Sequence, residues 1–459
     1  MSEHPARRGE LSRTEMLAIS LLVATVFGQA IVWGANNNVL AAAAAFAQVV
    51  CAIAVALLLG RAGPGFNRVT ALPTLLAFLV FALGCAGLLA QPRQDWAGPV
   101  LAAAGASALS IAPDATLLEL AKLAGAGALA LAAARIGERR RRLHVAILAL
   151  LMAGAAYTVL SLFLWNVDQD RIWGAFKGEH RWRFTATFLN GNAAGCFLSM
   201  LLVLAVDGLL VAVRAMRHAP PGLKGPALQQ ASVLGACVFI FTVAAAATLS
   251  RSALLASAAA ILLILLWPSR RRAGRRRRRA ARILAPLGGA ALLALMIGGG
   301  LALAGGQTLS RMETLRRDAD TRLDAYRLMV EDLRQAPEFG YGLGAFPQVL
   351  SHGRTLAQAE AVWNFRAAHN AVLHTALEGG APMTALIALL FVVILYTAVR
   401  AGERASFWGL RRGLVAALLV VLTCASVDIA LNVPAIAALS LTLAGLSLGG
   451  AAGALRGGR

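Results

Sequence analysis

The sequence predicts an all-α polytopic membrane protein with about twelve transmembrane helices and one large outer loop that itself contains helices. Three observations carry this prediction. Hydrophobic residues make up 59% of the 459 residues and charged residues only 14%, whereas soluble domains hold about 25% charged residues. The mean hydropathy is +0.69. The apolar residues also gather in long stretches, which excludes an ordinary cytosolic enzyme, a disordered chain and a fibrous protein.

The charges are few but strongly biased, with 43 Lys and Arg against 22 Asp and Glu and a net charge of +21. A basic nucleic-acid-binding protein concentrates its positive charge on a soluble face. This chain has no soluble face of that size, so we expect no nucleic-acid partner and assign the charges to segments between membrane spans. The cysteines lie far apart in apolar stretches without a CxxC pair, which predicts neither disulfides nor a metal site. They are Cys51, Cys85, Cys196, Cys237 and Cys424.

Twelve apolar stretches approach or exceed the roughly 20 residues that a helix needs to cross a bilayer. A further stretch, 97–112, is short and rich in small residues, and predicts a surface or re-entrant segment. We expect no cleavable signal at the N-terminus, because no small-residue cleavage site precedes the next span. The expected spans are 16–34, 39–60, 72–90, 116–134, 145–165, 187–213, 230–249, 252–268, 283–305, 371–399, 414–433 and 435–454.

Basic residues determine the expected orientation, since cytoplasmic loops of membrane proteins are enriched in Lys and Arg. Every odd-numbered gap between the spans is basic and most even-numbered gaps are not, which predicts cytoplasmic N- and C-termini. The longest basic run, Arg270–Arg282, holds nine arginines. Such runs are explained as stop-transfer anchors, and contact with anionic membrane lipids follows from them.

Some outer charges have no such explanation. The outer segments at about 166–186 and 306–370 are long and charged, and long loops in a compact protein usually carry function. Arg251 lies in the short outer turn between spans seven and eight, where an ionisable group near membrane depth is a functional candidate. Alternatively, Arg251 has no function and its long side chain merely extends to the membrane surface, which is known as snorkelling. Ser250 or Ser252 is expected to cap the helix that follows.

The first outer segment leads into span six with two arginines, Arg181 and Arg183, on either side of Trp182. One interpretation is an interfacial anchor, with the tryptophan in the headgroup region and the arginines on lipid phosphates. The other is a polyanion site, because a guanidinium group matches phosphate oxygens with two parallel hydrogen bonds. Asn190 or Asn192 is expected to cap the helix at its free amides.

The large outer loop contains apolar and charged residues at helical spacing over 321–334, which predicts a helix on the outer surface. The helix should stop at 337–346, where three glycines alternate with other residues. We expect these glycines to form a tight turn close to a ligand or to other backbone. No βαβ pattern surrounds them, so they do not indicate a nucleotide site. Alternatively, this helix only covers the outer surface and has no functional role.

The end of the loop enters span ten with His369 at the membrane entrance and Glu378 about two and a half turns deeper. A carboxylate inside a span is costly, so Glu378 needs a partner, and His374 is four residues away on the same helix face. His369 is better placed to meet a substrate, and histidine accepts protons near neutral pH. Asp428, in predicted span eleven, is a further buried carboxylate with no partner evident from the sequence.

Taken together, these residues resemble the O-antigen ligase and polymerase superfamily of bacterial glycan assembly. The resemblance covers about 180–385, within a single integral membrane domain over 1–459. Two positions depart from the family pattern: Ala186 stands where glycine is usual, and Gly191 where proline is frequent. The matching segments are Arg183–Asn192, Ser250–Arg251, Arg322–Phe346, His369–Asn370 and Glu378–Gly380.

The resemblance implies a metal-independent glycosyltransferase without a cofactor. Such enzymes move a glycan from an undecaprenyl diphosphate carrier to an acceptor at the periplasmic face of the bacterial inner membrane. It assigns the diphosphate to Arg183 and Arg251 and the role of general base to His369. It makes Arg181 a secondary phosphate candidate and Arg322 a glycan or phosphate contact. The supporting residues would be Asn190, Asn192, Ser250, Asn370 and Glu378.

Elementary chemistry agrees with this assignment, because fixed guanidinium groups stabilise charge that develops on a leaving diphosphate. The acceptor stays open: a lipid A core for a ligase, a second carrier-linked chain for a polymerase, or a protein side chain. A lipid or polysaccharide transporter is the alternative from another class. It predicts inverted repeats and broken helices at mid-membrane. The sequence contains no convincing repeat, and its polar groups gather at the outer edge.

Overall fold

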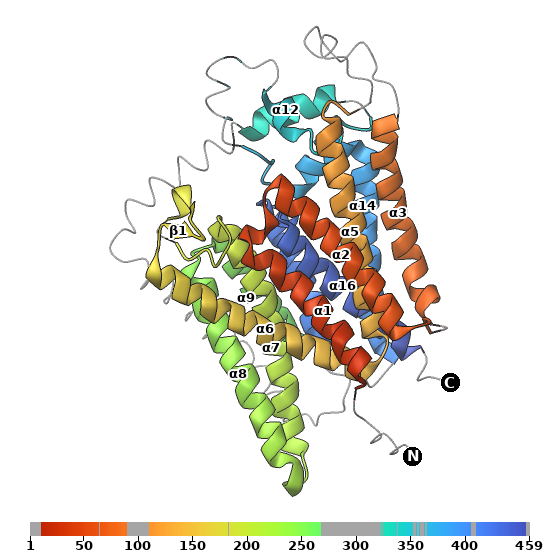
Figure 1. Ribbon diagram of the computed structural model, residues 1–459, viewed down its shortest axis with the longest axis vertical. Helices are drawn as coiled ribbons and strands as arrows, with labels where there is room; N and C mark the ends of the chain where they lie inside the picture. Colours follow the sequence, from red (N-terminus) through yellow and green to blue (C-terminus); the bar gives the residue numbers. More distant parts are fainter. Residues whose placement is uncertain are drawn as a thin grey trace.

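The computed structural model describes residues 11–63, 65–89, 110–181, 183–267, 325–336, 338–351, 365–404 and 410–455, with isolated positions between 323 and 362. These residues are mostly helical, which confirms the predicted all-α membrane fold (Figure 1). The long helices are α1 (Arg13–Ile31), α2 (Asn38–Leu59), α3 (Phe66–Leu89), α5 (Pro113–Gly137), α6 (Arg140–Val167), α7 (Gly191–His218), α8 (Lys224–Ala247), α9 (Arg251–Leu266), α14 (Ala371–Arg404), α15 (Arg411–Ala425) and α16 (Pro434–Ala454).

Nine of the described helices are long and apolar enough to cross a membrane. Helices α9 and α15 are shorter, with 16 and 15 residues. Together these helices account for every predicted span except 283–305. That span lies outside the described residues, as do most of 97–112 and the arginine run Arg270–Arg282.

The predicted span 414–433 extends too far. Helix α15 ends at Ala425, and a turn containing the short helix η5 (Ala430–Asn432) follows it. Pro434 then starts α16, since proline fits the first helical turn, where its missing N–H costs no hydrogen bond. Asp428 therefore lies in the turn that joins two helices and not inside a span.

Helices α16 and α7 are the most buried of the candidate spans. Helix α16 packs along α5 through glycines spaced four residues apart, and a Cβ at each of them would overlap an α5 backbone carbonyl. Small residues at this spacing let two helix backbones approach closely. These glycines are Gly445, Gly449 and Gly453, opposite Ala130, Ala134 and Glu138.

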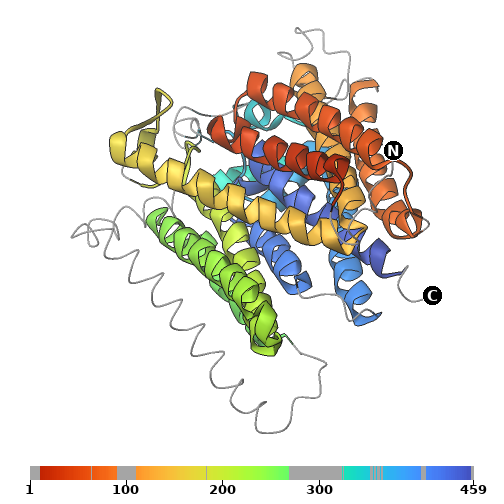
Figure 2. The same cartoon turned by 60° about the horizontal axis from the view of Figure 1, so that its bottom comes forward.

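The bundle has two distinct ends (Figures 1 and 2). One end, here called the loop end, carries α12 (Phe346–Ser351) and a hairpin of β1 (Arg171–Ile172) and β2 (Ala175–Phe176). The opposite end contains the start of α1 and the end of α16. The connection between α7 and α8, with η3 (Pro221–Leu223), also lies there.

Ion pairs hold the helices together at that opposite end. Arg139 on the α5–α6 connection lies 3.1 Å from a carboxylate oxygen of Glu15 on α1. Arg412 on α15 lies 2.6 Å from the fully buried Asp207 on α7. Part of the basic charge at this end is therefore neutralised within the protein.

Two indoles fix the hairpin to the loop end of α1. The short helix η1 (Trp33–Ala35) follows α1, and the Trp33 indole N–H donates to the Ile172 carbonyl at 2.9 Å. In return the Trp173 indole N–H donates to the Ile31 carbonyl, also at 2.9 Å. This reciprocal pair anchors the segment that leads to the outer arginines.

Candidate functional site

His369 and Asp428 meet at the loop end of the bundle. The His369 Nδ1 atom lies 3.1 Å from the Asp428 Oδ1 atom. The Asp428 side chain is 6% exposed and that of His369 is 22% exposed. Because a carboxylate only accepts hydrogen bonds, Nδ1 carries the proton in this arrangement and Nε2 is the other ring nitrogen. Asp428, whose partner was not evident from the sequence, is thus paired with the predicted base.

Asn370 secures the chain directly after His369. Its amide Nδ2 donates to the Ser426 carbonyl at 3.0 Å, next to the turn that holds Asp428. Its Oδ1 accepts the N–H of Leu373 at 3.0 Å, which is the N-cap hydrogen bond of α14. Both partners of the Asn370 side chain are backbone groups, and through them Asn370 joins the start of α14 to the end of α15.

The segment before α7 holds a second group of polar side chains. His180 ends the short helix η2 (Gly178–His180), and its carbonyl accepts the Arg183 N–H at 3.0 Å. The Lys177 ammonium donates to the Arg183 carbonyl at 3.2 Å. Arg183 is half-buried, while Arg181 is exposed. Of the two predicted arginines, Arg183 therefore lies deeper in the protein.

Electrostatics connects the two groups. Burial lowers the pKa of the His180 imidazole to about 4, and the positive charge of Arg183 acts in the same direction. The negative charge of Asp428 opposes this shift, while Lys177 and His369 contribute to it. Burial also lowers the pKa of Lys177. His180 is therefore a neutral imidazole at physiological pH, within electrostatic range of both Arg183 and the His369–Asp428 pair.

The start of α7 is built by local hydrogen bonds. Asn190 is the N-cap, and its side chain accepts the N–H groups of Asn192 at 2.7 Å and Ala193 at 3.3 Å. Of the two predicted caps, the structure selects Asn190. Just before it, the Thr187 hydroxyl lies 2.7 Å from the Tyr157 hydroxyl on α6. Ala186, where the family has glycine, is buried with φ +47, a backbone conformation that glycine adopts without strain.

Arg251 starts α9 beside this segment. The Phe184 N–H donates to the Ala247 carbonyl at 3.2 Å, which places the α8–α9 turn against the residues that follow Arg183. The Arg251 side chain is exposed. The predicted Ser250 cap is wrong in one respect: Ser250 is the N-cap residue, but its side chain makes no cap hydrogen bond. The Thr248 hydroxyl instead accepts the Ser250 N–H at 3.3 Å.

The glycine-rich segment of the large loop packs against backbone. The Tyr341 N–H donates to the Leu377 carbonyl at 2.9 Å, and the Gly342 N–H donates to the Glu378 carbonyl at 2.8 Å. Gly340 and Gly380 both have positive φ. A Cβ atom on Gly340 would overlap the backbone of α14, and a Cβ atom on Gly380 would overlap the backbone of the loop. Of the two predicted environments, ligand or backbone, the structure therefore shows backbone.

Glu378 has a structural partner on each side, as predicted for a carboxylate inside a span. The His374 Nε2 atom lies 3.5 Å from the Glu378 Oε1 atom, which confirms the predicted pair. The same oxygen accepts the Phe346 N–H at 3.2 Å. His374 also lies 2.8 Å from the amide nitrogen of Asn432. Glu378 thus holds the loop onto α14 by hydrogen bonds at the start of α12.

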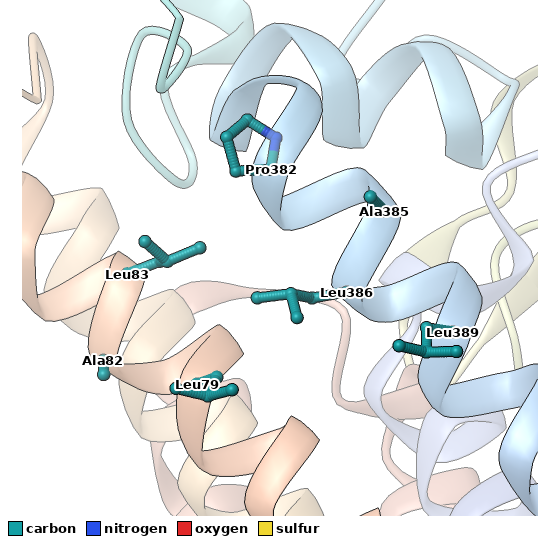
Figure 3. Close-up of a pocket in the computed structure, with 7 residues that line it drawn as sticks. All are labelled: Leu79, Ala82, Leu83, Pro382, Ala385, Leu386 and Leu389. Carbon is teal, nitrogen blue, oxygen red and sulfur yellow. The ribbon is translucent and has the colours of Figure 1, made fainter.

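A separate cavity of about 550 Å³ lies between α3 and α14 (Figure 3). It contains no charged or hydrogen-bonding side chain, so it does not belong to the polar site. Its lining residues are Leu79, Ala82, Leu83, Pro382, Ala385, Leu386 and Leu389. In the described part of the chain, no three His, Cys, Asp or Glu side chains gather in an arrangement that could hold a metal ion.

The structure thus pairs His369 with Asp428, and electrostatic interactions connect His180 with this pair and with Arg183. Arg251 starts the segment that adjoins the residues after Arg183. Of the other predicted residues, Arg181 is exposed, and Arg322 lies outside the described residues, as does Trp182. Sequence reasoning did not assign Asp428 or His180 to the site. For Asp428 the available signal was a carboxylate with no partner evident from the sequence. For His180 the sequence contained no such signal.

Comparison with known families agrees with the motifs. Residues 236–388 match the family model described as O-antigen ligase. The matched region is about a third of the chain and includes Arg251, His369 and Glu378. Arg183 and Asp428 lie on either side of it. No curated protein matches the chain.

Proposed function

We propose that this chain, which matches the O-antigen ligase family model over residues 236–388, transfers a glycan from an undecaprenyl-diphosphate carrier to an acceptor. The site would face the periplasm of a bacterial inner membrane, with both termini in the cytoplasm. The observation that carries the proposal is the His369–Asp428 pair, held at the loop end within electrostatic range of His180, which lies beside Arg183. A base next to a phosphate-binding cation is what displacement of a diphosphate requires.

His369 is the general base in this proposal. Its Nδ1–H donates to Asp428, so Nε2 is the nitrogen that takes the proton of the acceptor hydroxyl. The acceptor oxygen forms a bond to the anomeric carbon, and the bond from that carbon to the diphosphate oxygen breaks. The bonding electron pair leaves with the carrier diphosphate. Attack opposite the leaving group inverts the anomeric configuration.

Arg183 and Arg251 stabilise the charge that develops on the leaving diphosphate. They belong to different elements, one before α7 and one at the start of α9, and two separate guanidinium groups can hold two phosphates. His180 lies beside Arg183 as a neutral ring. It adds a hydrogen-bonding group to this region without adding a further positive charge.

The proposal is tested with purified protein in lipid nanodiscs and a carrier-linked glycan as donor. One reaction receives a lipid A core and a second receives another carrier-linked chain, so the extended acceptor distinguishes ligase from polymerase. We expect the His369→Ala variant to lose transfer while retaining expression and membrane insertion. His144→Ala is the matched control, because His144 lies at the opposite end of the bundle near the start of α6. Full transfer by His369→Ala protein contradicts the assignment of the base.

A further inference from the structure

His369 has a backbone conformation that is uncommon for a residue other than glycine. Its φ is +51, in the left-handed region that only a few per cent of such residues adopt, histidine more often than most. Such strain persists only where surrounding contacts hold it. The contacts around the His369 peptide therefore determine where its imidazole lies.

One of these contacts comes from the large loop. The Tyr326 hydroxyl donates to the His369 carbonyl at 3.1 Å. Tyr326 is part of the helical segment 325–335, and the two residues are 43 positions apart in the chain. The bond reaches the peptide directly after the strained φ angle, so it restrains the orientation of that peptide plane.

The loop helix is itself firmly seated. Ala325 and Met329 are buried in a cluster with Phe346, Ala368 and Leu377, so one face of the helix packs on the start of α14. Burial of this apolar face fixes the helix in one orientation, and Tyr326 lies between these two buried positions.

The imidazole is restrained from two further directions. Asp428 holds Nδ1, and the Phe365 ring meets the imidazole edge-on with 5.5 Å between ring centres. Neither contact fixes the peptide. If the peptide relaxed to a right-handed φ, the side chain would leave this position, because the Cα–Cβ direction turns with the backbone.

We infer that Tyr326 is a positioning residue for the base, whose hydroxyl holds the His369 peptide in the left-handed conformation that places the imidazole against Asp428. The inference rests on the proposed function for its kinetic consequence. The loop helix thus sets the geometry of the base. The alternative that the sequence left open, a helix that only covers the outer face, does not account for this contact.

The Tyr326→Phe variant removes the hydroxyl and keeps the ring. We expect the kcat of glycan transfer to fall about tenfold, as expected for the loss of one hydrogen bond, while the KM for donor and acceptor stays within about twofold. Tyr341→Phe is the matched control. It removes another hydroxyl of the same loop, one that donates to the Asp332 carbonyl at 2.8 Å. We expect it to retain the wild-type rate within about twofold.

A second measurement does not depend on activity. In protein labelled with ¹⁵N-histidine, the His369 ring signals are assigned by their loss in His369→Ala protein. We expect Tyr326→Phe to shift or broaden these signals and Tyr341→Phe to leave them unchanged. If no variant or wild-type protein transfers glycan but the signals change as expected, the proposed function fails and the positioning inference stands.

Two outcomes overturn the inference. In the first, Tyr326→Phe protein retains both the wild-type kcat and the wild-type His369 signals. In the second, Tyr341→Phe reduces kcat and perturbs the signals as strongly as Tyr326→Phe, so that general packing of the loop, and not the Tyr326 bond, positions His369.

Discussion

Replacing Asp428 with asparagine separates the charge of this residue from its shape. Asp428 Oδ1 lies 3.1 Å from His369 Nδ1 and also accepts the Ile429 N–H at 2.7 Å. In Asp428→Asn, the amide oxygen can occupy the place of Oδ1 and keep both bonds, so the position of the imidazole and its Nδ1–H tautomer are retained. What is lost is the negative charge, which stabilises the imidazolium that forms when Nε2 takes a proton.

The size of the effect follows from the geometry of the pair. Two unit charges 3.1 Å apart interact by about 5 kcal/mol at an effective dielectric constant of about 20, which is a ceiling of roughly 10⁴-fold in rate. A hydrogen bond to a charged group contributes about 1.5–3 kcal/mol, which is a floor of about tenfold. We expect the variant to lie between these limits, because the negative charge of the aspartate stabilises the protonated imidazole.

The assay is the initial rate of glycan transfer in nanodiscs at saturating donor, with thermal unfolding measured in parallel. We expect kcat to fall at least tenfold and the melting temperature to change little, since the Ile429 bond is retained. Asp168→Asn is the matched control: Asp168 also accepts backbone N–H groups at the loop end, from Asp170 and Arg171, without a histidine partner. A variant at position 428 that keeps half of the wild-type rate refutes the reasoning.

Three further predictions concern other positions. Arg251→Lys keeps the charge but not the planar two-point donor, and we expect transfer to fall about tenfold; an unchanged rate argues against paired hydrogen bonds to phosphate. His180 has its pKa lowered to about 4 in the folded protein, so the stability it contributes is present above pH 6.5 and is lost as the pH falls toward 4. The loss reaches roughly 3 kcal/mol, and thermal unfolding of His180→Gln should show a correspondingly flatter pH dependence; equal slopes contradict this. Ala186→Gly relieves a positive φ and should raise the free energy of unfolding by about 0.5–1 kcal/mol, whereas Ala193→Gly inside α7 should lower it.

The membrane helices were predictable because the signal for a span is local. About twenty consecutive apolar residues have one stable arrangement in a bilayer, whatever the rest of the chain does. The error at 414–433 has the same origin. Three polar residues, Ser426, Asp428 and Asn432, are spread among apolar neighbours there, and an average over twenty residues hides the turn that they form.

The site was only partly predictable, for a related reason. The His374–Glu378 pair follows from a spacing of four on one helix, so the sequence alone indicates it. The His369–Asp428 pair joins residues 59 apart, with all of α14 and α15 between them. No spacing rule reaches that far, because the contact depends on the start of α14 lying beside the end of α15. His180 was missed because its burial, and hence its neutrality, exists only in the folded protein.

The family motifs divide into two kinds by what their hydrogen bonds do. Asn190, Asn370 and Glu378 direct their side chains at backbone N–H groups that start a helix, at α7, α14 and α12. Gly340 and Gly380 let the loop backbone meet the backbone of α14. Substitutions at these positions should therefore lower stability first. They should affect transfer only indirectly, by displacing the helices and the loop that hold the site.

His369 is different, because its side chain reaches across to another element and its backbone is strained where it does so. Such a conformation persists only where surrounding contacts hold it, and at His369 these contacts also determine the position of the imidazole. Restraints from Tyr326, Asp428 and Asn370 converge on this one residue from the loop helix, the α15–α16 turn and the start of α14. In the proposed mechanism the loop end therefore serves to place a single imidazole, and the loop participates in that placement.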